Sequence, residues 1–116
     1  MHAFDVLGDP VRRRILELLV DQEQSSGDLF TAIRDEFGIS QPGVSQHLRV
    51  LRESGFVRVT AIGTRRLYAV EAAPLQDIDQ WLQPFRDFWT QRLDALGTEL
   101  ARGRRDRRAK DSTDEE

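Results

Sequence analysis

The sequence has no cysteine. This absence excludes disulfide bonds, a nucleophilic thiol and every metal site built from thiolate ligands. Histidine is also scarce: His2 and His47 are too few for a typical zinc cluster. We therefore expect a protein that binds no metal and carries no cofactor.

Long hydrophobic runs are missing as well. The chain contains no apolar stretch of about 18 residues or more, the length that would span a membrane. The N-terminal residues 1–5 lack the basic and then apolar pattern of a signal peptide. We expect a cytoplasmic protein without membrane contact, and the length of 116 residues suits one domain with a modest core.

Lysine is nearly absent, because Lys110 is the only lysine among 17 basic residues. The net charge of −3 argues weakly against nucleic acid as a partner. Binding to DNA depends, however, on where the positive charge lies. Several arginines gather in one short stretch: Arg49, Arg52, Arg58, Arg65 and Arg66.

That stretch begins within the most informative segment, residues 39–57, and extends beyond it. Ser40 and Pro42 are typical of a helix cap and first turn. A buried stripe is predicted from the i, i+4, i+7 spacing of Val44, Leu48 and Leu51. The opposite face has side chains that hydrogen-bond base edges and phosphates: Gln41, Gly43, Ser45, Gln46, Arg49 and Arg52. We interpret the segment as the recognition helix of a DNA-binding regulator.

The neighbouring segments complete a helix-turn-helix and a hairpin. One helix is expected from Pro10 to Val20, and another follows the turn at 25–28 and ends at Gly38. The very short turn after Gly38 joins this helix to the recognition helix. From Phe56 the apolar period changes to two, which predicts a β-hairpin turning at 62–64. For the arginines at 12–14 we favour a solvated helix face over contact with phosphates.

The C-terminal part is rich in large apolar residues. A long helix is expected from Leu75 to about Arg102, with a kink or a break at Pro84. Its wide apolar face predicts a dimer surface; the alternative is packing within one subunit. The predicted interface consists of Phe4, Leu7, Trp81, Phe85, Phe88 and Trp89. We divide the chain into a domain at 1–102 and a charged, disordered tail at 103–116.

The order of elements is that of a winged helix. In its motifs the chain resembles the ArsR (arsenic-repressor-like) family of bacterial transcriptional regulators. The resemblance covers roughly residues 3–100 and is carried by LGDPVRRRIL (7–16), ISQPGVSQHLRVL (39–51), GFV (55–57) and GTRRLY (63–68). It implies a mainly α fold with a β-hairpin wing, in which N- and C-terminal helices form the dimer.

The resemblance, with the geometry of a helix in the major groove, implies which residues contact DNA. The base-facing and phosphate-facing candidates are Gln41, Ser45, Gln46 and Arg49. Gly43 either allows close approach to the DNA backbone or is a tolerated helix glycine. Arg65 and Arg66 place positive charge from the wing on the backbone or in the minor groove. For His47, next to the core residue Leu48, we favour a structural role over one in the groove.

The chain departs from the family pattern in two ways. The metal sensors of the family carry a cysteine-containing motif on the helix before the recognition helix, and residues 28–33 contain no thiol. A second family site uses carboxylates and histidines of the C-terminal helix, where this chain has Asp77 and Asp79 without histidine. Metal sensing at these sites is therefore not expected. In addition, residues 33–37 make the first of the two helices about one turn longer than usual, which affects the tilt of the next helix.

The predicted function is a DNA-binding transcriptional regulator, with repression favoured. One recognition helix reads too few base pairs for useful specificity, so we expect a homodimer on an inverted-repeat operator. The alternative is a winged-helix module that binds protein instead of DNA, which would suit the negative net charge. An enzyme is not expected, because no phosphate loop or serine–histidine–acid grouping is present. The aromatic helix could also line a small-molecule pocket, although such residues more often form core or interface.

Overall fold

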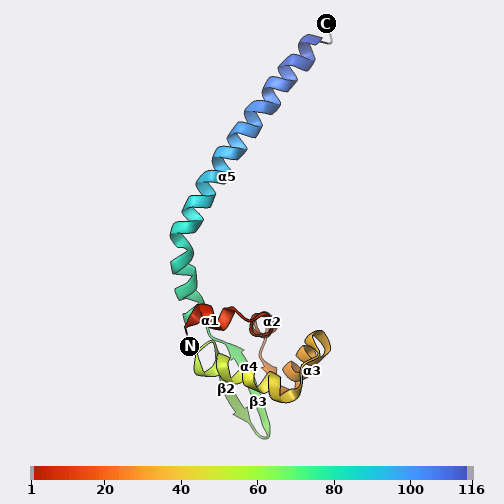
Figure 1. The fold of residues 1–116 in the computed structure, drawn as a ribbon, viewed down its shortest axis with the longest axis vertical. Helices are drawn as coiled ribbons and strands as arrows, with labels where there is room; N and C mark the ends of the chain where they lie inside the picture. Colours follow the sequence, from red (N-terminus) through yellow and green to blue (C-terminus); the bar gives the residue numbers. More distant parts are fainter. Residues whose placement is uncertain (1, 115–116) are drawn as a thin grey trace. The chain divides into compact units, whose positions relative to one another are not determined.

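The computed structural model describes residues 2–114, with side chains described through Arg104. Figure 1 shows the helices and strands in chain order. They are α1 (Ala3–Leu7), α2 (Pro10–Leu19), β1 (Gln24–Ser25), α3 (Ser26–Phe37), α4 (Gln41–Glu53), β2 (Val57–Ile62), β3 (Arg65–Val70) and α5 (Ala72–Asp114). The chain forms two units, residues 1–79 and residues 80–116, and each is described by itself. The predicted fold class, mainly α with a β-hairpin wing, is confirmed.

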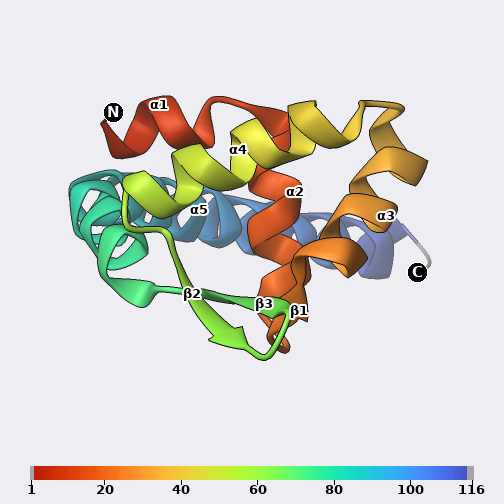
Figure 2. The same ribbon diagram turned by 90° about the horizontal axis from the view of Figure 1, so that it is seen from below.

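The first unit is built around one apolar core. Every helix from α1 to α4 contributes a buried side chain, and the segment entering β2 adds Phe56, which is 1% exposed. The expected stripe of α4 is buried as predicted. The largest fully buried side chains are Phe56, Ile15, Leu29, Ile33, Leu51, Val6 and Val44. Figure 2 shows the hairpin of β2 and β3 extending away from these helices.

The helix boundaries follow from local capping. The Asp9 carboxylate accepts hydrogen bonds from the backbone N–H groups of Val11 (2.8 Å) and Arg12 (3.2 Å), and Pro10 follows as the first helical residue. Ser40 caps α4 in the same way, with its hydroxyl accepting from the Gly43 N–H at 3.4 Å. Gly38 ends α3 at φ 69°, a left-handed conformation that favours glycine. These predicted helix ends are confirmed.

The wing is a three-stranded antiparallel sheet in the order β1-β3-β2. Val59 of β2 lies opposite Tyr68 of β3, and the loop between the strands starts with Gly63 at φ 62°. A positive φ at the first of two loop residues is the geometry of a type II′ hairpin turn. Strand β1 was not predicted: Gln24 pairs with Tyr68, and a strand of two residues shows no alternation in the sequence.

Helix α5 differs from the expectation in two respects. It runs without a break from Ala72 to Asp114, with Pro84 inside it, so the predicted break is wrong. A helix can continue past a proline at the loss of one backbone hydrogen bond. It is also longer than expected, since it continues through Asp114 and does not end near Arg102; residues 115 and 116 lie outside the described part. Arginine, alanine and lysine favour helices, and extending an existing helix costs far less than starting one. The division into a domain at 1–102 and a disordered tail at 103–116 stays a prediction.

Within residues 2–114, no helix combines the length and the apolar character needed to cross a bilayer.

Candidate nucleic-acid interface

A groove of about 640 Å³ lies in the first unit between α4, the start of α3 and strand β3. Its floor is apolar and consists of Phe30, Val44, Leu48 and Tyr68. The other lining residues are mostly polar and include three arginines: Ser26, Gly27, Gln41, Ser45, Arg49, Arg52, Glu53 and Arg66. The exposed face of the predicted recognition helix and two residues of the wing strand β3 therefore border the same hollow.

Four of the predicted DNA-contact residues line this groove. Gln41, Ser45 and Arg49 come from successive turns of α4, and Arg66 comes from β3. Gln46 and Arg65 are exposed but do not line it. The groove therefore brings together four of the seven predicted DNA-contact residues. Gln46, Arg65 and Gly43 lie outside its lining.

Gly43 also lies on α4 outside the groove lining. A Cβ atom at this position would be 3.7 Å from the Ser40 hydroxyl and 3.8 Å from the Ile39 side chain. These are ordinary contact distances, so packing within the chain does not require glycine here. Close approach to a partner and simple tolerance both remain open as explanations.

The basic side chains of the groove differ in their partners. Arg49 forms an ion pair with Glu53, one helical turn further on, at 2.9 Å between Nε and Oε1. Both side chains are exposed, so the pair is weak and easily exchanged for another anion. Within residues 2–104, the side chains of Arg52 and Arg66 form no ion pair or hydrogen bond. These guanidinium groups are available to a negatively charged partner.

Some groove residues were missing from the predicted site. Glu53 is one of them, and its signal was present, since a glutamate four residues after Arg49 is placed for an i, i+4 pair. Three more, Ser26, Gly27 and Phe30, come from α3. Their proximity to α4 depends on how the two helices cross, which sequence spacing alone does not give.

Arg58, expected to add to the positive stretch, is neutralised. It donates a hydrogen bond to Glu71 at 2.8 Å and lies 3.6 Å from a Glu23 oxygen. The hydrogen bond to Glu71 is the main reason that the pKa of Arg58 is raised. The positive charge of the wing therefore comes from Arg65 and Arg66.

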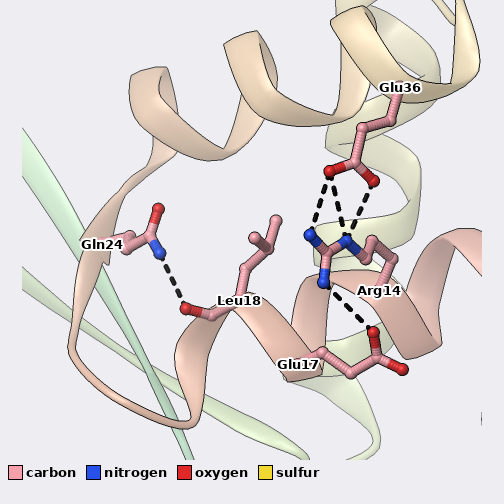
Figure 3. Close-up of polar contacts among 5 residues, drawn as sticks. All are labelled: Arg14, Glu17, Leu18, Gln24 and Glu36. Atoms are coloured by element: carbon pink, nitrogen blue, oxygen red, sulfur yellow. Dashed lines mark hydrogen bonds and ion pairs between the residues drawn. The ribbon is translucent and has the colours of Figure 1, made fainter.

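The three arginines of α2 have partners within the protein. Arg12 donates to the Val6 and Asp5 carbonyls, and Arg13 donates to the Leu7 carbonyl at 2.7 Å. Figure 3 shows Arg14 reaching Glu36 of α3 with two nitrogens and Glu17 with a third. The contacts of Arg13 and Arg14 lie at the surface, as expected for a solvated helix face, whereas the partners themselves were not predicted.

The Arg14 pair uses the extra turn of α3. Glu36 lies in that turn, and the hydrogen bond from Arg14 lowers its pKa while raising that of the guanidinium. Ile33, at the start of the same turn, is fully buried. Near the C-terminal end of α2, the Gln24 side chain donates to the Leu18 carbonyl at 2.7 Å, as Figure 3 also shows. Contacts from the last turn of α3 and from β1 thus both hold α2 in place.

His47 faces α2 and does not line the groove. Its Nδ1 atom lies 3.4 Å from an Arg12 nitrogen and 4.0 Å from the Asp9 carboxylate. Burial alone would raise the pKa of Asp9, but hydrogen bonds from the Arg12 and Val11 N–H groups, with the charges of His47 and Arg12, lower it. This placement supports the structural role that we favoured for His47.

The predicted dimer residues fall in both units. In the first unit Phe4 is exposed and Leu7 packs against the core. In the second unit α5 exposes large apolar side chains along its length: Trp81, Phe85, Phe88, Trp89, Leu93, Leu96 and Leu100. The Trp81 and Phe85 rings are in contact, with centroids 4.7 Å apart. The dimer surface itself stays a prediction.

No metal centre is apparent in the described part of the chain. Within residues 2–104, no three side chains of histidine, aspartate or glutamate come together as a metal ion would require.

Comparison with known proteins gives a consistent result. The helix-turn-helix domain family matches residues 7–60. The transcriptional repressor SdpR of Bacillus subtilis is 32% identical over 84 residues, covering 72% of this chain and 89% of the repressor. The crystal structure of the ArsR family transcriptional regulator RHA00566 is similar with a TM-score of 0.64 and 27% identity, covering 76% of this chain and 87% of that one. The homodimeric winged helix-turn-helix DNA-binding domain Mb0332 from Mycobacterium bovis is similar with a TM-score of 0.56 and 25% identity, covering 73% and 75%.

Proposed function

Because the chain belongs to the ArsR family of winged helix-turn-helix transcriptional regulators, we propose that it is a cytoplasmic repressor that binds an inverted-repeat operator as a homodimer. The main structural support for this proposal is the groove beside α4. It places amide, hydroxyl and guanidinium groups over an apolar floor on one side of a short helix. These are the groups that read base edges and bind phosphates.

In this proposal α4 enters the major groove with its N-terminal turns toward the bases. Gln41 and Ser45 contact base edges, since glutamine suits adenine and serine accepts or donates to either strand. Arg49 exchanges Glu53 for a guanine or a phosphate, at little cost because the pair is exposed. Arg65 and Arg66 add backbone or minor-groove contacts from the wing.

Two copies are needed for specificity. One recognition helix reads only a few base pairs, and a two-fold dimer places a second helix on the next half-site. The similar protein from Mycobacterium bovis is a homodimer. For this chain the exposed aromatics of α5 and Phe4 of α1 are the surfaces that we assign to the partner copy.

Repression follows from occupancy, because a dimer seated on a promoter excludes the polymerase. The related protein of Bacillus subtilis is named a transcriptional repressor. We propose no catalytic activity and no bound metal or cofactor for this chain.

Footprinting on the DNA upstream of its own gene tests the proposal. We expect two protected half-sites with two-fold symmetry, and derepression of a reporter when the protein is removed. The double variant Gln41→Ala with Ser45→Ala should abolish the footprint, whereas Thr31→Ala, an exposed residue of α3 outside the groove, should leave it unchanged. Protection of one unpaired half-site, or of none, would contradict the proposal.

The alternative is a winged-helix module whose groove binds a protein. The net charge of −3 and the apolar groove floor with Phe30 and Tyr68 favour it. The two functions differ in salt dependence: DNA binding weakens steeply as salt rises, because counterions are released. Absence of any DNA shift at low salt would favour the alternative.

A further inference from the structure

Arg12 joins three helices of the first unit. From its place in the first turn of α2, its Nε donates to the Val6 carbonyl at 2.8 Å and one terminal nitrogen donates to the Asp5 carbonyl at 3.0 Å. Both carbonyls belong to the last turn of α1, where carbonyls have no partner from a following helical turn, and the Asp5 carbonyl also accepts from the Gly8 N–H at 3.3 Å. The other terminal nitrogen lies 3.4 Å from Nδ1 of His47, in the middle of α4. One guanidinium therefore touches α1, α2 and α4.

The chemistry of the contact with α4 is defined by the arginine. A guanidinium offers only donors, so a hydrogen bond between these two atoms uses Nδ1 of His47 as the acceptor. The Asp9 carboxylate lies 4.0 Å from the same Nδ1 atom and is held by two backbone N–H groups. Arg12, Asp9 and His47 thus form one half-buried polar joint between the start of α2 and α4.

The neighbouring arginine shows what is particular to Arg12. Arg13 also caps the last turn of α1, through the Leu7 carbonyl at 2.7 Å. Within the described residues, however, Arg13 forms no hydrogen bond or ion pair with α4. Both side chains donate hydrogen bonds to carbonyls at the end of α1, but only Arg12 also contacts a side chain of α4.

We propose that Arg12 is a positioning residue that fixes the orientation of α4 relative to α1 and thereby sets the separation of the two recognition helices in the DNA-bound dimer. The proposal rests on the proposed function, because α1 carries Phe4 of the predicted dimer surface and α4 carries the base-reading face. A rigid joint between the two makes the dimer sensitive to the spacing of half-sites. A loose joint lets each recognition helix adjust separately.

The test measures that sensitivity. A duplex is selected from a random pool by the wild-type protein, and its affinity is compared with that of the same duplex carrying one base pair inserted between the half-sites. For Arg12→Ala we expect the ratio of the two affinities to fall by roughly 2- to 30-fold, the range for residues that couple two sites. For Arg13→Ala the ratio should equal that of the wild type. Loss of stability alone does not change this ratio when all proteins are folded at the assay temperature.

A second measurement uses the free protein. Hydrogen exchange of the backbone amides of α4 should accelerate relative to those of α3 in Arg12→Ala and not in Arg13→Ala. If Arg12→Ala fails to fold, Arg12→Lys replaces it, since an ammonium keeps the charge and cannot reach α1 and His47 at once.

The outcomes separate the two claims. If the wild-type protein selects no duplex, the proposed function fails. If it does select one, and Arg12→Ala matches Arg13→Ala in both the spacing ratio and the α4 exchange, the positioning role is overturned and the proposed function stands.

Discussion

Replacement of both wing arginines by alanine should reduce the salt dependence of DNA binding. Arg65 and Arg66 are the first two residues of β3, directly after the hairpin turn, and both are exposed. Within residues 2–104, neither forms an ion pair with an acidic side chain. They are therefore free to neutralise phosphates, and the double variant removes four such charges from a dimer.

The magnitude follows from counterion release. Each phosphate contact contributes about 0.9 to the slope of log affinity against log salt, so four contacts contribute about 3.6. Between about 50 mM and about 200 mM salt, a fourfold change, the wild-type protein should lose roughly 150-fold more affinity than the double variant. Binding to all duplex sequences should weaken, because contacts with phosphates carry no sequence information.

Fluorescence anisotropy of a labelled duplex across this salt range measures the slope. Arg58→Ala is the matched control, because it removes one arginine from the same sheet, and that arginine is already paired with Glu71 and Glu23. Its slope should remain at the wild-type value. The single variants Arg65→Ala and Arg66→Ala show how much of the slope each arginine contributes. Arg66 borders the groove and Arg65 lies outside it. A wild-type slope for the double variant would refute the assignment of the wing to phosphates.

Three other predictions concern the dimer, metals and pH. Phe88→Ala or Trp89→Ala, on the exposed face of α5, should weaken the dimer by at least about 2 kcal/mol in analytical ultracentrifugation; unchanged dissociation constants in both would exclude this interface. Micromolar zinc, cadmium or arsenite should not release the protein from DNA in a gel shift, since the chain has no thiol, and loss of the shift would contradict this. The lowered pKa of Asp9 stabilises the fold above the ordinary aspartate pKa, and this contribution is lost as the pH falls through the lowered value. In urea unfolding the advantage of the wild type over Asp9→Asn should therefore be present at neutral pH and disappear in acid, and a constant difference would contradict it.

Local signals explain why so much of the fold was predictable. Asp9 with Pro10, Ser40 with Pro42, and the glycine at 38 each mark a helix end through bonds within a few residues. The buried stripe of α4 was readable because the period of a helix is fixed. Such features depend on near neighbours in the sequence and need no knowledge of the tertiary structure.

Features that depend on distant partners were not predictable. Strand β1 exists because Gln24 meets Tyr68, 44 positions later, and two residues carry no pattern of their own. The arginines of α2 were interpreted as a solvated face because charge runs usually are, and their surface partners, Glu36 and the α1 carbonyls, were not predicted. The α3 side of the groove depends on the crossing of two helices in the same way.

The net charge of −3 illustrates why composition misleads here. Most arginines of the first unit are bound within the protein: those of α2 to carbonyls or Glu36, Arg34 to Asp35, and Arg58 to Glu71. Within residues 2–79, the arginines with neither an ion pair nor a hydrogen bond are Arg52, Arg65 and Arg66, and Arg49 has only its exposed partner Glu53. All four lie on α4 or β3, the two elements that a winged helix presents to DNA. Acidic side chains of this unit therefore pair mainly with arginines away from α4 and β3. The positive charge that has no acidic partner is concentrated on α4 and β3.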